Sequence, residues 1–205
     1  MPKRKHMQEY EYYYVGTEFY CYPGTKVLVN KFGIRDNLKL SDVERRITAL
    51  KALELKENPI GGIFDLNHLC NIHEFVFSEL YEWAGRIRGG DYMFKGDTMF
   101  CRAIYIEQNF DEYYEKLKEE KFLQGLGKNI FCKRLAYYMG ELNAIHPYRD
   151  GNGRTCRLYF SQLAENAGYD LVFNNVKEDE LLNADIAAFK REYEPLVDVL
   201  KKVVQ

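Results

Sequence analysis

The sequence of 205 residues lacks the features that define two broad classes of protein. No apolar run approaches the roughly 18–20 residues that a membrane-spanning helix needs. Basic residues are not in excess either, because 29 Lys and Arg stand against 31 Asp and Glu and leave a net charge of -2. Non-specific binding to nucleic acid needs such an excess. The sequence therefore predicts neither a membrane protein nor a protein that binds nucleic acid directly.

The cysteines give no sign of a structural or redox site. They number five, stand far apart and include no CxxC pair, so neither a zinc site nor a thioredoxin-like site is indicated. The first six residues are basic, but tyrosines and acids follow them where a secretory signal would have an apolar segment. We therefore expect reduced thiols and a cytoplasmic protein.

Helical spacing of apolar residues dominates the chain and predicts a mainly α fold. The expected helices cover 41–57, 66–82, 105–119, 129–144, 152–167 and 178–203, the last broken near Asn183 or Pro195. Ser41 stands three residues before Glu44, a capping-box pattern that predicts the start of the first helix. Within 91–103, two apolar runs flank a turn that contains Gly96, which predicts a β-hairpin. We expect one domain, a helical bundle with one small hairpin.

The segment HPYRDGNGRTCR, residues 146–157, joins two predicted helices and carries the residues suited to chemistry. The glycines on either side of Asn152 suit positive φ, and successive backbone N–H groups in such a turn form a nest for an anion. The next helix points its positive end at the same place. Arg154 and Arg157 share one face of its first turn. Because arginine opposes the helix dipole there, the pair indicates a phosphate ligand.

Two more side chains of this segment complete a phosphate-transfer site. Asp150 offers the hard oxygen that Mg²⁺ prefers when the metal also bridges phosphates. His146 can take a proton near neutral pH. A simple glycine-rich turn between two helices would explain the Gly-Asn-Gly triplet alone, but it does not explain the base, the carboxylate and the arginine pair together.

The segment resembles the signature of Fic domains, His-Pro-Phe-x-Asp/Glu-Gly-Asn-Gly-Arg-x-x-Arg, with Tyr148 where phenylalanine is usual. A buried tyrosine there needs a partner for its hydroxyl. Segments 22–25, 81–88 and 95–100 also resemble parts of bacterial Fic proteins. The resemblance implies a single-domain Fic fold over 21–205, an N-terminal extension over 1–20, and a hairpin called the flap, about 91–103, beside the active site.

The resemblance also implies a protein adenylyltransferase, which transfers AMP from ATP to a Tyr, Ser or Thr hydroxyl of a target protein. His146 would deprotonate the hydroxyl, and Asp150 would hold Mg²⁺. The phosphates would be held by the backbone nest and the Asn amide of Gly151, Asn152 and Gly153, with Arg154 at the β-phosphate and Arg157 at the γ-phosphate. An exposed edge of the flap would dock the target, through Tyr92, Met93, Phe94, Lys95, Gly96, Met99 and Phe100.

Many Fic proteins are restrained by a helix with the pattern Ser/Thr-x-x-x-Glu-Gly/Asn, whose glutamate pairs with the second motif arginine. The one match here is Ser161–Asn166. Its Glu165 lies eight residues beyond Arg157 on the same predicted helix, about 12 Å along the axis, so it cannot reach Arg157. We therefore expect a toxin restrained by a separate small antitoxin that supplies the glutamate.

Other functions stay open at this point. Fic-fold enzymes of another type transfer UMP or phosphocholine or remove AMP, and a branch resembling Doc toxins phosphorylates its target. That branch replaces the second glycine, whereas Gly153 and Arg157 are both present here. A non-catalytic nucleotide-binding module would lack one of the polar motif residues, and all of these are present: His146, Asp150, Asn152, Arg154 and Arg157. The oligomeric state, the target and the antitoxin are not indicated by the sequence.

Overall fold

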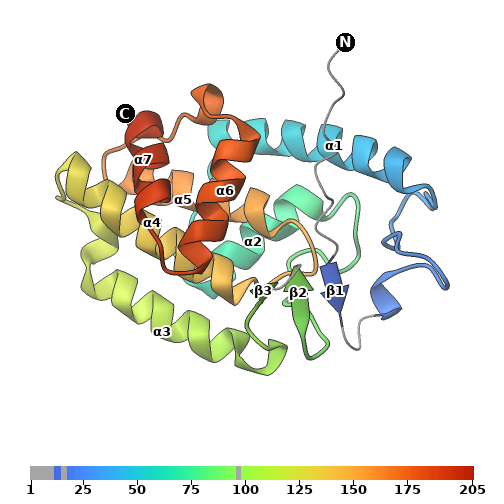
Figure 1. Ribbon diagram of the computed structural model, residues 1–205. Helices are drawn as coiled ribbons and strands as arrows, with labels where there is room; N and C mark the ends of the chain where they lie inside the picture. The colour runs from blue at the N-terminus through green and yellow to red at the C-terminus, as the bar shows by residue number, and fades with distance from the viewer. Residues whose placement is uncertain (1–11, 15–17, 96–97) are drawn as a thin grey trace, which may run out of the picture.

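The computed structural model describes residues 12–14, 18–95 and 98–205. Its α-helices are α1 (Asn37–Glu57), α2 (Leu66–Phe77), α3 (Ile106–Glu119), α4 (Lys128–Ile145), α5 (Asn152–Asn166), α6 (Glu178–Phe189) and α7 (Glu194–Val203). Figure 1 shows them gathered around α4 and α5, with the strands at one end of these two helices. The prediction of a mainly α fold is confirmed.

A small antiparallel sheet accompanies the helices. It contains β1 (Tyr12–Tyr14), β2 (Met93–Lys95) and β3 (Thr98–Met99), in the order β1-β2-β3. The hairpin of β2 and β3 confirms the predicted flap, whose Gly96 lies outside the described residues. The sequence did not predict β1, which pairs with the other edge of β2.

Two helix boundaries differ clearly from the prediction, each for a local reason, and a third feature agrees with it. α1 begins at Asn37 because Asp36 caps it and accepts a bond from the Lys39 N–H at 2.8 Å, so the capping box at Ser41 is wrong. α2 ends at Phe77 and not at residue 82, because the chain turns after Ser78. The break before Pro195 is confirmed, since α7 begins at Glu194 with the proline in its first turn.

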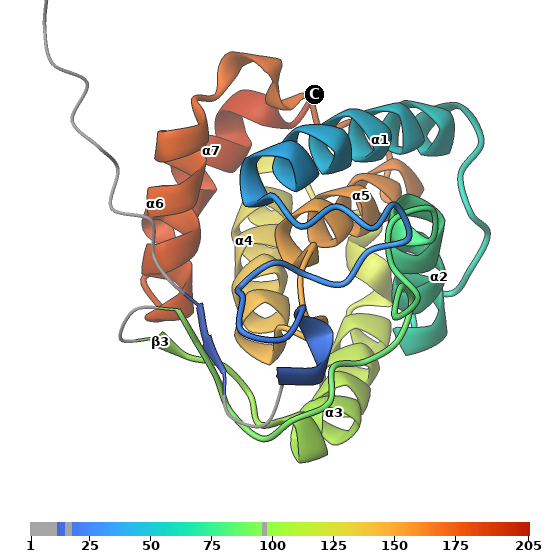
Figure 2. The ribbon, with the colours of Figure 1, turned by 90° about the vertical axis from the view of Figure 1, so that its right-hand side faces the viewer.

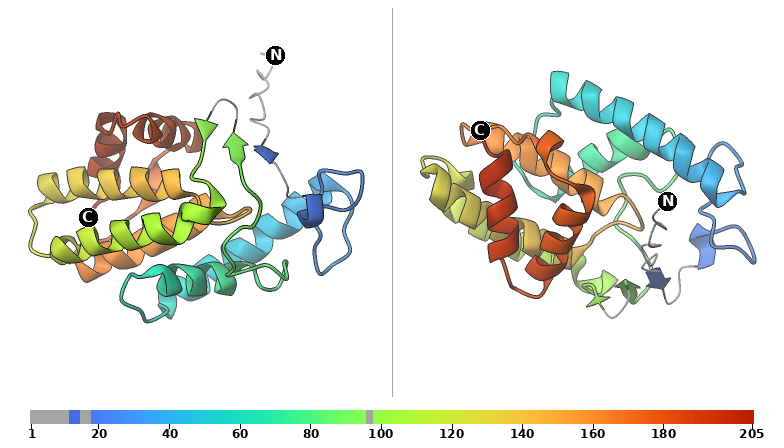
Figure 3. Two further views of the ribbon diagram at one scale, coloured as in Figure 1. Left: turned by 90° about the horizontal axis from the view of Figure 1, so that it is seen from below. Right: turned by 45° about the horizontal axis from the view of Figure 1, so that its top comes forward.

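Two buried clusters hold the fold together. The larger one joins α3, α4, α5 and α7, and α4 contributes many of its fully buried side chains. The smaller one lies between α1, α2 and the loop before α1, and includes Leu40, Phe77 and Tyr81. Figure 3 shows α1 and α2 set apart from the α3–α4 layer. The turn from α4 to α5 thus receives side chains from both clusters.

No helix among the described residues is long and apolar enough to cross a membrane. All five cysteines are described, and each is a free thiol.

Candidate active site

The turn between α4 and α5 starts at a residue with left-handed backbone. His146 caps α4 with φ of 50°, and Pro147 follows it. Arg88, which is 4% exposed, donates from side-chain Nε to the His146 carbonyl at 2.9 Å, and its backbone N–H donates to the Pro147 carbonyl at 2.8 Å. Its Nη2 also donates to the Cys101 carbonyl. One buried guanidinium therefore ties the turn to the chain that leaves the flap.

Gly151 and Asn152 fix the other end of the turn. Gly151 has φ of +79°, and a Cβ on it would lie 2.4 Å from Cζ of Phe77, so only glycine fits. The Asn152 amide donates to the Tyr148 carbonyl at 2.8 Å and accepts from the Tyr148 N–H at 2.9 Å. This amide is 4% exposed and holds the turn closed. Both polar atoms of the amide thus bond within the loop, and its contact with phosphate stays a prediction.

The groups best suited to bind an anion at this turn are the first N–H groups of α5. The Gly151 N–H donates to Oδ1 of its neighbour Asp150 at 2.5 Å, which removes it from the predicted nest. The first intrahelical bond runs from the Thr155 N–H to the Gly151 carbonyl at 3.0 Å. The first three N–H groups of α5 therefore have no partner within the helix; they belong to Asn152, Gly153 and Arg154. Together they form the positive end of the helix dipole.

Arg154 is held by α1. Its Nη2 lies 2.5 Å from Oε1 of Glu44, and its guanidinium lies over the Phe77 ring, 4.7 Å from the centroid. The Tyr81 hydroxyl donates to the other oxygen of Glu44, and Thr48 lies 3.4 Å from Nη1. Burial and the Glu44 carboxylate raise the pKa of Tyr81. Sequence reasoning missed this pairing, since it assigned Glu44 to a capping box.

Arg157 stands differently from Arg154, with no ion pair to any residue that the structure describes. Its Nη1 lies 3.4 Å from the point where a Cβ at Gly153 would stand, so the guanidinium reaches back over the start of α5. Asp185 on α6 is the nearby acid: burial raises its pKa to about 6, while Arg157 and Lys95 act to lower it. Both motif arginines thus lie at the N-terminal end of α5. No sequence pattern indicated that Asp185 would lie near Arg157.

His146 lies at the meeting point of the turn and the flap. Its ring is 6% exposed and stacks on Phe100 with centroids 3.7 Å apart. Burial lowers its pKa to about 3, so the imidazole is neutral at physiological pH. Nδ1 lies 3.2 Å from the Asn143 carbonyl, which accepts only from the N–H tautomer at that nitrogen. The basic lone pair is therefore on Nε2, as a general base requires.

A second buried histidine supports the turn from behind. His73 uses both ring nitrogens: Nδ1 accepts from the Gly85 N–H at 2.8 Å, and Nε2 donates to the Asp150 carbonyl at 3.1 Å. Its ring stacks on Tyr148 with centroids 3.8 Å apart. Tyr148 is fully buried, and its hydroxyl lies 3.5 Å from the Cys70 sulfur. The extra hydroxyl of this tyrosine thus has a partner, as the sequence required.

Asp150 offers a carboxylate that fits Mg²⁺. Its side chain is 39% exposed, and Oδ1 lies 3.6 Å from Nη2 of Arg154. No cluster of three or more acidic, His or Cys residues exists among the described residues, so the protein would supply few ligands. Mg²⁺ in phosphate sites commonly takes one or two carboxylates and completes its shell with phosphate oxygens and water. A single half-exposed aspartate beside the helix end suits that chemistry.

The flap residues differ in how far they are exposed to solvent. Met93 and Phe100 are buried, Lys95 is half-buried and Met99 is 52% exposed. Burial lowers the pKa of Lys95, whereas the Asp150 carboxylate acts to raise it. On one side of the flap, β1 pairs with the edge of β2 (Figure 2). The far edge of β3 pairs with no other described strand.

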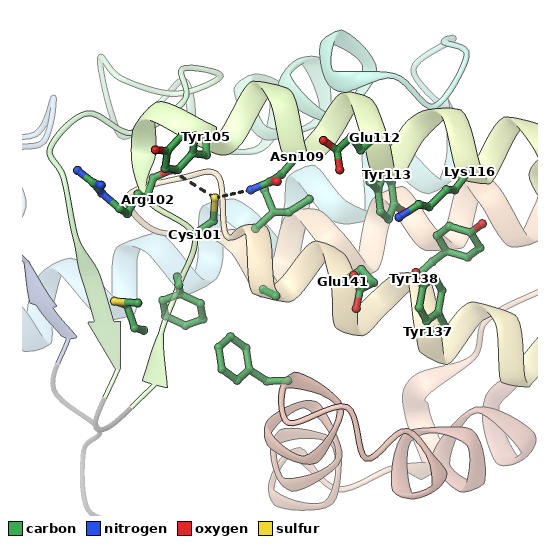
Figure 4. A pocket seen from close by; sticks show the side chains of 15 residues that line it. Cys101, Arg102, Tyr105, Asn109, Glu112, Tyr113, Lys116, Tyr137, Tyr138 and Glu141 are labelled. Atoms are coloured by element: carbon green, nitrogen blue, oxygen red, sulfur yellow. Dashed lines mark hydrogen bonds between the residues drawn. The ribbon is translucent and has the colours of Figure 1, made fainter.

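A cavity of about 460 Å³ lies on the other side of Phe100. Figure 4 shows it between the flap, α3 and α4, with Tyr105 and Asn109 on one wall and Tyr137 and Glu141 on another. No residue of 146–157 lines it. The cavity is therefore separate from the helix end that would bind phosphate.

Comparison with known proteins agrees with this geometry. The model of the Fic/DOC family matches residues 63–164. The protein adenylyltransferase VbhT of Bartonella schoenbuchensis is 40% identical over 170 residues, which is 83% of this chain but 35% of VbhT. The probable protein adenylyltransferase Fic of Salmonella typhimurium is 34% identical over 189 residues, covering 92% of this chain and 93% of that protein.

Solved structures give the same result. BepC of Bartonella tribocorum, crystallised with bound AMPPNP, is 26% identical with a TM-score of 0.87, over 92% of this chain and 97% of that one. A Fic domain of Bartonella quintana with bound ADP is 28% identical with the same TM-score, over 92% and 95%. This chain belongs to the Fic/DOC family.

Proposed function

We propose that this chain is a protein adenylyltransferase that transfers AMP from ATP to a hydroxyl side chain of a target protein. The observation that carries the proposal is the position of His146: it ends α4 with Nδ1 on the Asn143 carbonyl, next to the first N–H groups of α5, which have no partner within that helix. Adenylyltransferase relatives and nucleotide-bound structural neighbours support it.

The proposed reaction is an in-line displacement at the α-phosphorus. Nε2 of His146 takes the hydroxyl proton, and the oxygen forms a new bond to the α-phosphorus while the bond to the bridging oxygen of pyrophosphate breaks. The N–H groups at the start of α5 and the two motif arginines hold the phosphates, Arg154 near the β-phosphate and Arg157 near the γ-phosphate. Mg²⁺, held by Asp150, would neutralise charge on the triphosphate.

The same proposal covers how the enzyme is restrained and where it works. We assign it the role of a toxin inhibited by a separate antitoxin, because Glu165 is exposed on the same helix as Arg157 and no described carboxylate pairs with that arginine. A cytoplasmic location, where ATP is abundant and thiols stay reduced, suits the five free cysteines.

A labelling experiment separates this function from its alternatives. The purified chain and its His146→Ala variant are incubated with Mg²⁺, host lysate and ATP labelled at either the α- or the γ-phosphate. We expect a protein band from the α-label with the wild type alone, while thermal melts show that both chains are folded. Label from the γ-position would indicate a kinase. Labelling by UTP or CDP-choline in place of ATP would indicate another donor, and no transfer from any donor would indicate a binding module.

A further inference from the structure

The cavity between the flap, α3 and α4 is lined mainly by aromatic side chains (Figure 4). Six rings contribute to its wall: Phe100, Tyr105, Tyr113, Tyr137, Tyr138 and Phe189. Its volume of about 460 Å³ lies in the range of sites that take one ligand or a few side chains. The wall therefore suits a large group that is aromatic or apolar.

The charged residues on the cavity wall balance one another. Glu112 and Lys116 come from α3, Glu141 comes from α4, and Arg102 comes from the chain that leaves the flap. Asp91 already holds the Arg102 guanidinium through two hydrogen bonds, of 2.8 and 3.1 Å. Two positive and two negative groups on the wall leave no net charge. The cavity thus favours an uncharged occupant over an acidic or a basic one.

The mouth of the cavity carries exposed apolar surface. Tyr105 lines the cavity and is nearly half exposed, and its neighbour Ile104 is 66% exposed. Exposed apolar side chains that stand singly are normal, whereas a group of them beside a cavity is typical of an interaction site. A partner that enters the cavity would also cover these two side chains.

The outer edge of β3 leads into the cavity. Alternate residues of a strand direct their backbone groups to opposite edges. The Phe100 N–H donates to the Met93 carbonyl of β2 at 3.0 Å, so the backbone groups of Met99 point to the outer edge. The next outward N–H, that of Cys101, donates to the Ala144 carbonyl of α4 at 3.0 Å. An extended segment that pairs with β3 at Met99 therefore meets the α4 wall of the cavity.

Phe100 separates the cavity from the proposed base. Its ring stacks on the His146 imidazole with centroids 3.7 Å apart, and it also forms part of the cavity wall. Side chains on one face of an extended segment recur at every second residue, and two residues span about 7 Å. A hydroxyl residue at His146 and a second side chain in the cavity would therefore stand an even number of residues apart, one on each side of the Phe100 ring.

We propose that this cavity is a specificity subsite for the target protein. An extended acceptor segment pairs with the outer edge of β3 and inserts one large aromatic side chain, Phe, Tyr or Trp, into the cavity. The inference rests on the proposed function and names its substrate class: a hydroxyl residue with an aromatic residue at an even spacing, two residues away or four. The backbone pairing accepts many sequences, and the cavity selects among them.

Synthetic acceptor peptides test the subsite. Alanine-based peptides carry one tyrosine, with Phe placed one, two, three or four residues from it on either side, and matched sets carry Ser or Thr in place of the tyrosine. Transfer of AMP from α-labelled ATP gives kcat/KM for each peptide. We expect kcat/KM to be about tenfold higher for Phe at an even spacing than for Ala there. Glu or Lys at the same position should give no gain.

A matched pair of variants on α3 tests whether the gain arises in the cavity. Glu112→Trp fills the cavity, because Glu112 lines it, whereas Glu115→Trp adds the same ring at an exposed position that does not line it. We expect Glu112→Trp to lose the preference for the Phe peptide and Glu115→Trp to keep it. Transfer to the Ala peptide should be the same in both variants and the wild type, and thermal melts should show that all three chains are folded.

Three results would overturn the inference, and they differ in what else they remove. A gain at odd spacing, or no gain at any spacing, contradicts the subsite. A gain that Glu112→Trp and Glu115→Trp both retain shows that the aromatic residue binds outside the cavity. Lysate proteins that are labelled while no peptide is labelled refute the docked segment and leave the proposed function intact, whereas no transfer to peptide or protein refutes both.

Discussion

The phosphate loop and the flap lie side by side but are built in opposite ways. The loop, residues 146–152, is held by buried side chains from other elements: Arg88 bonds its first carbonyl groups, His73 bonds Asp150, and Phe77 leaves no room for a Cβ at Gly151. The strands of the flap are two or three residues long and are joined by backbone pairing. The comparison indicates that the chemistry needs fixed geometry, whereas docking of an acceptor needs an edge that accepts different sequences.

Gly151→Ala should give the largest loss of stability, because the new Cβ would clash with Phe77 at the closest contact of the loop. Left-handed backbone costs alanine about 1–2 kcal/mol, and the clash with Phe77 adds about 1–3 kcal/mol. Gly168→Ala is the matched control, since Gly168 has φ of +88° but nothing within 4 Å of the Cβ position. Urea unfolding should show a clearly greater loss of stability for Gly151→Ala. Equal losses in the two variants would mean that Phe77 moves aside freely.

The two buried histidines behind the loop should make the fold sensitive to acid. Burial lowers the pKa of both His73 and His146 to about 3. The unfolded chain binds these protons near pH 6.5 and the folded chain does not, so the free energy of unfolding decreases as pH falls below about 6.5. At pH 5 the loss is about 2 kcal/mol for each histidine.

Urea unfolding at pH 7.5 and pH 5.0 measures this loss. The His146→Asn variant should show a smaller difference between the two pH values than the wild type, by about 2 kcal/mol. The other titrating groups are the same in both chains, so their contributions to the pH dependence cancel in the comparison. An unchanged pH dependence in the variant would show that His146 is accessible to protons in the folded protein.

Glu44→Gln should have a smaller effect, confined to nucleotide binding. The substitution removes the charge that orients Arg154 but keeps the size of the side chain. We expect the Kd for AMPPNP to rise about tenfold, which corresponds to about 1.4 kcal/mol. Asp42→Asn, two residues earlier on α1, breaks exposed pairs with Arg45 and Arg46 and should leave the Kd unchanged. Calorimetric titration with AMPPNP measures the Kd of both variants. Equal Kd values would show that Glu44 does not contribute to nucleotide binding.

Met99→Ala on the flap should give the smallest effect. Its side chain is 52% exposed, so the stability change should stay below about 0.5 kcal/mol. If the flap acts through its backbone, labelling of lysate proteins by this variant should match that of the wild type within about twofold. A loss of labelling with unchanged stability would show that this side chain recognises the target.

The sequence predicted the parts of the site that are local. Glycines and a proline within a dozen residues determine where α4 ends and α5 begins, and the spacing of Arg154 and Arg157 places both at the same helix end. The hairpin followed from two apolar runs around a turn. These features depend on neighbours in the chain, which composition and spacing reveal.

The parts that were missed depend on distant contacts. Glu44 and Arg154 are 110 residues apart in sequence, and the pattern around Glu44 also fits a capping box, which Asp36 supersedes by starting α1 earlier. Asp185 reaches the site only through the packing of α6. β1 is three residues long, and its pairing with β2 is a tertiary contact that no local pattern marks.

The central claim is that His146 acts on the hydroxyl proton and not on the nucleotide. The most direct measurement compares His146→Ala with the wild type in two assays on the same preparation: AMPPNP affinity by calorimetry, and AMP transfer from ATP. We predict an unchanged Kd within about twofold and a loss of transfer of about 10²–10⁴-fold, the contribution of a general base. Transfer that survives in the variant, or a loss of transfer matched by an equal loss of affinity, would contradict the account.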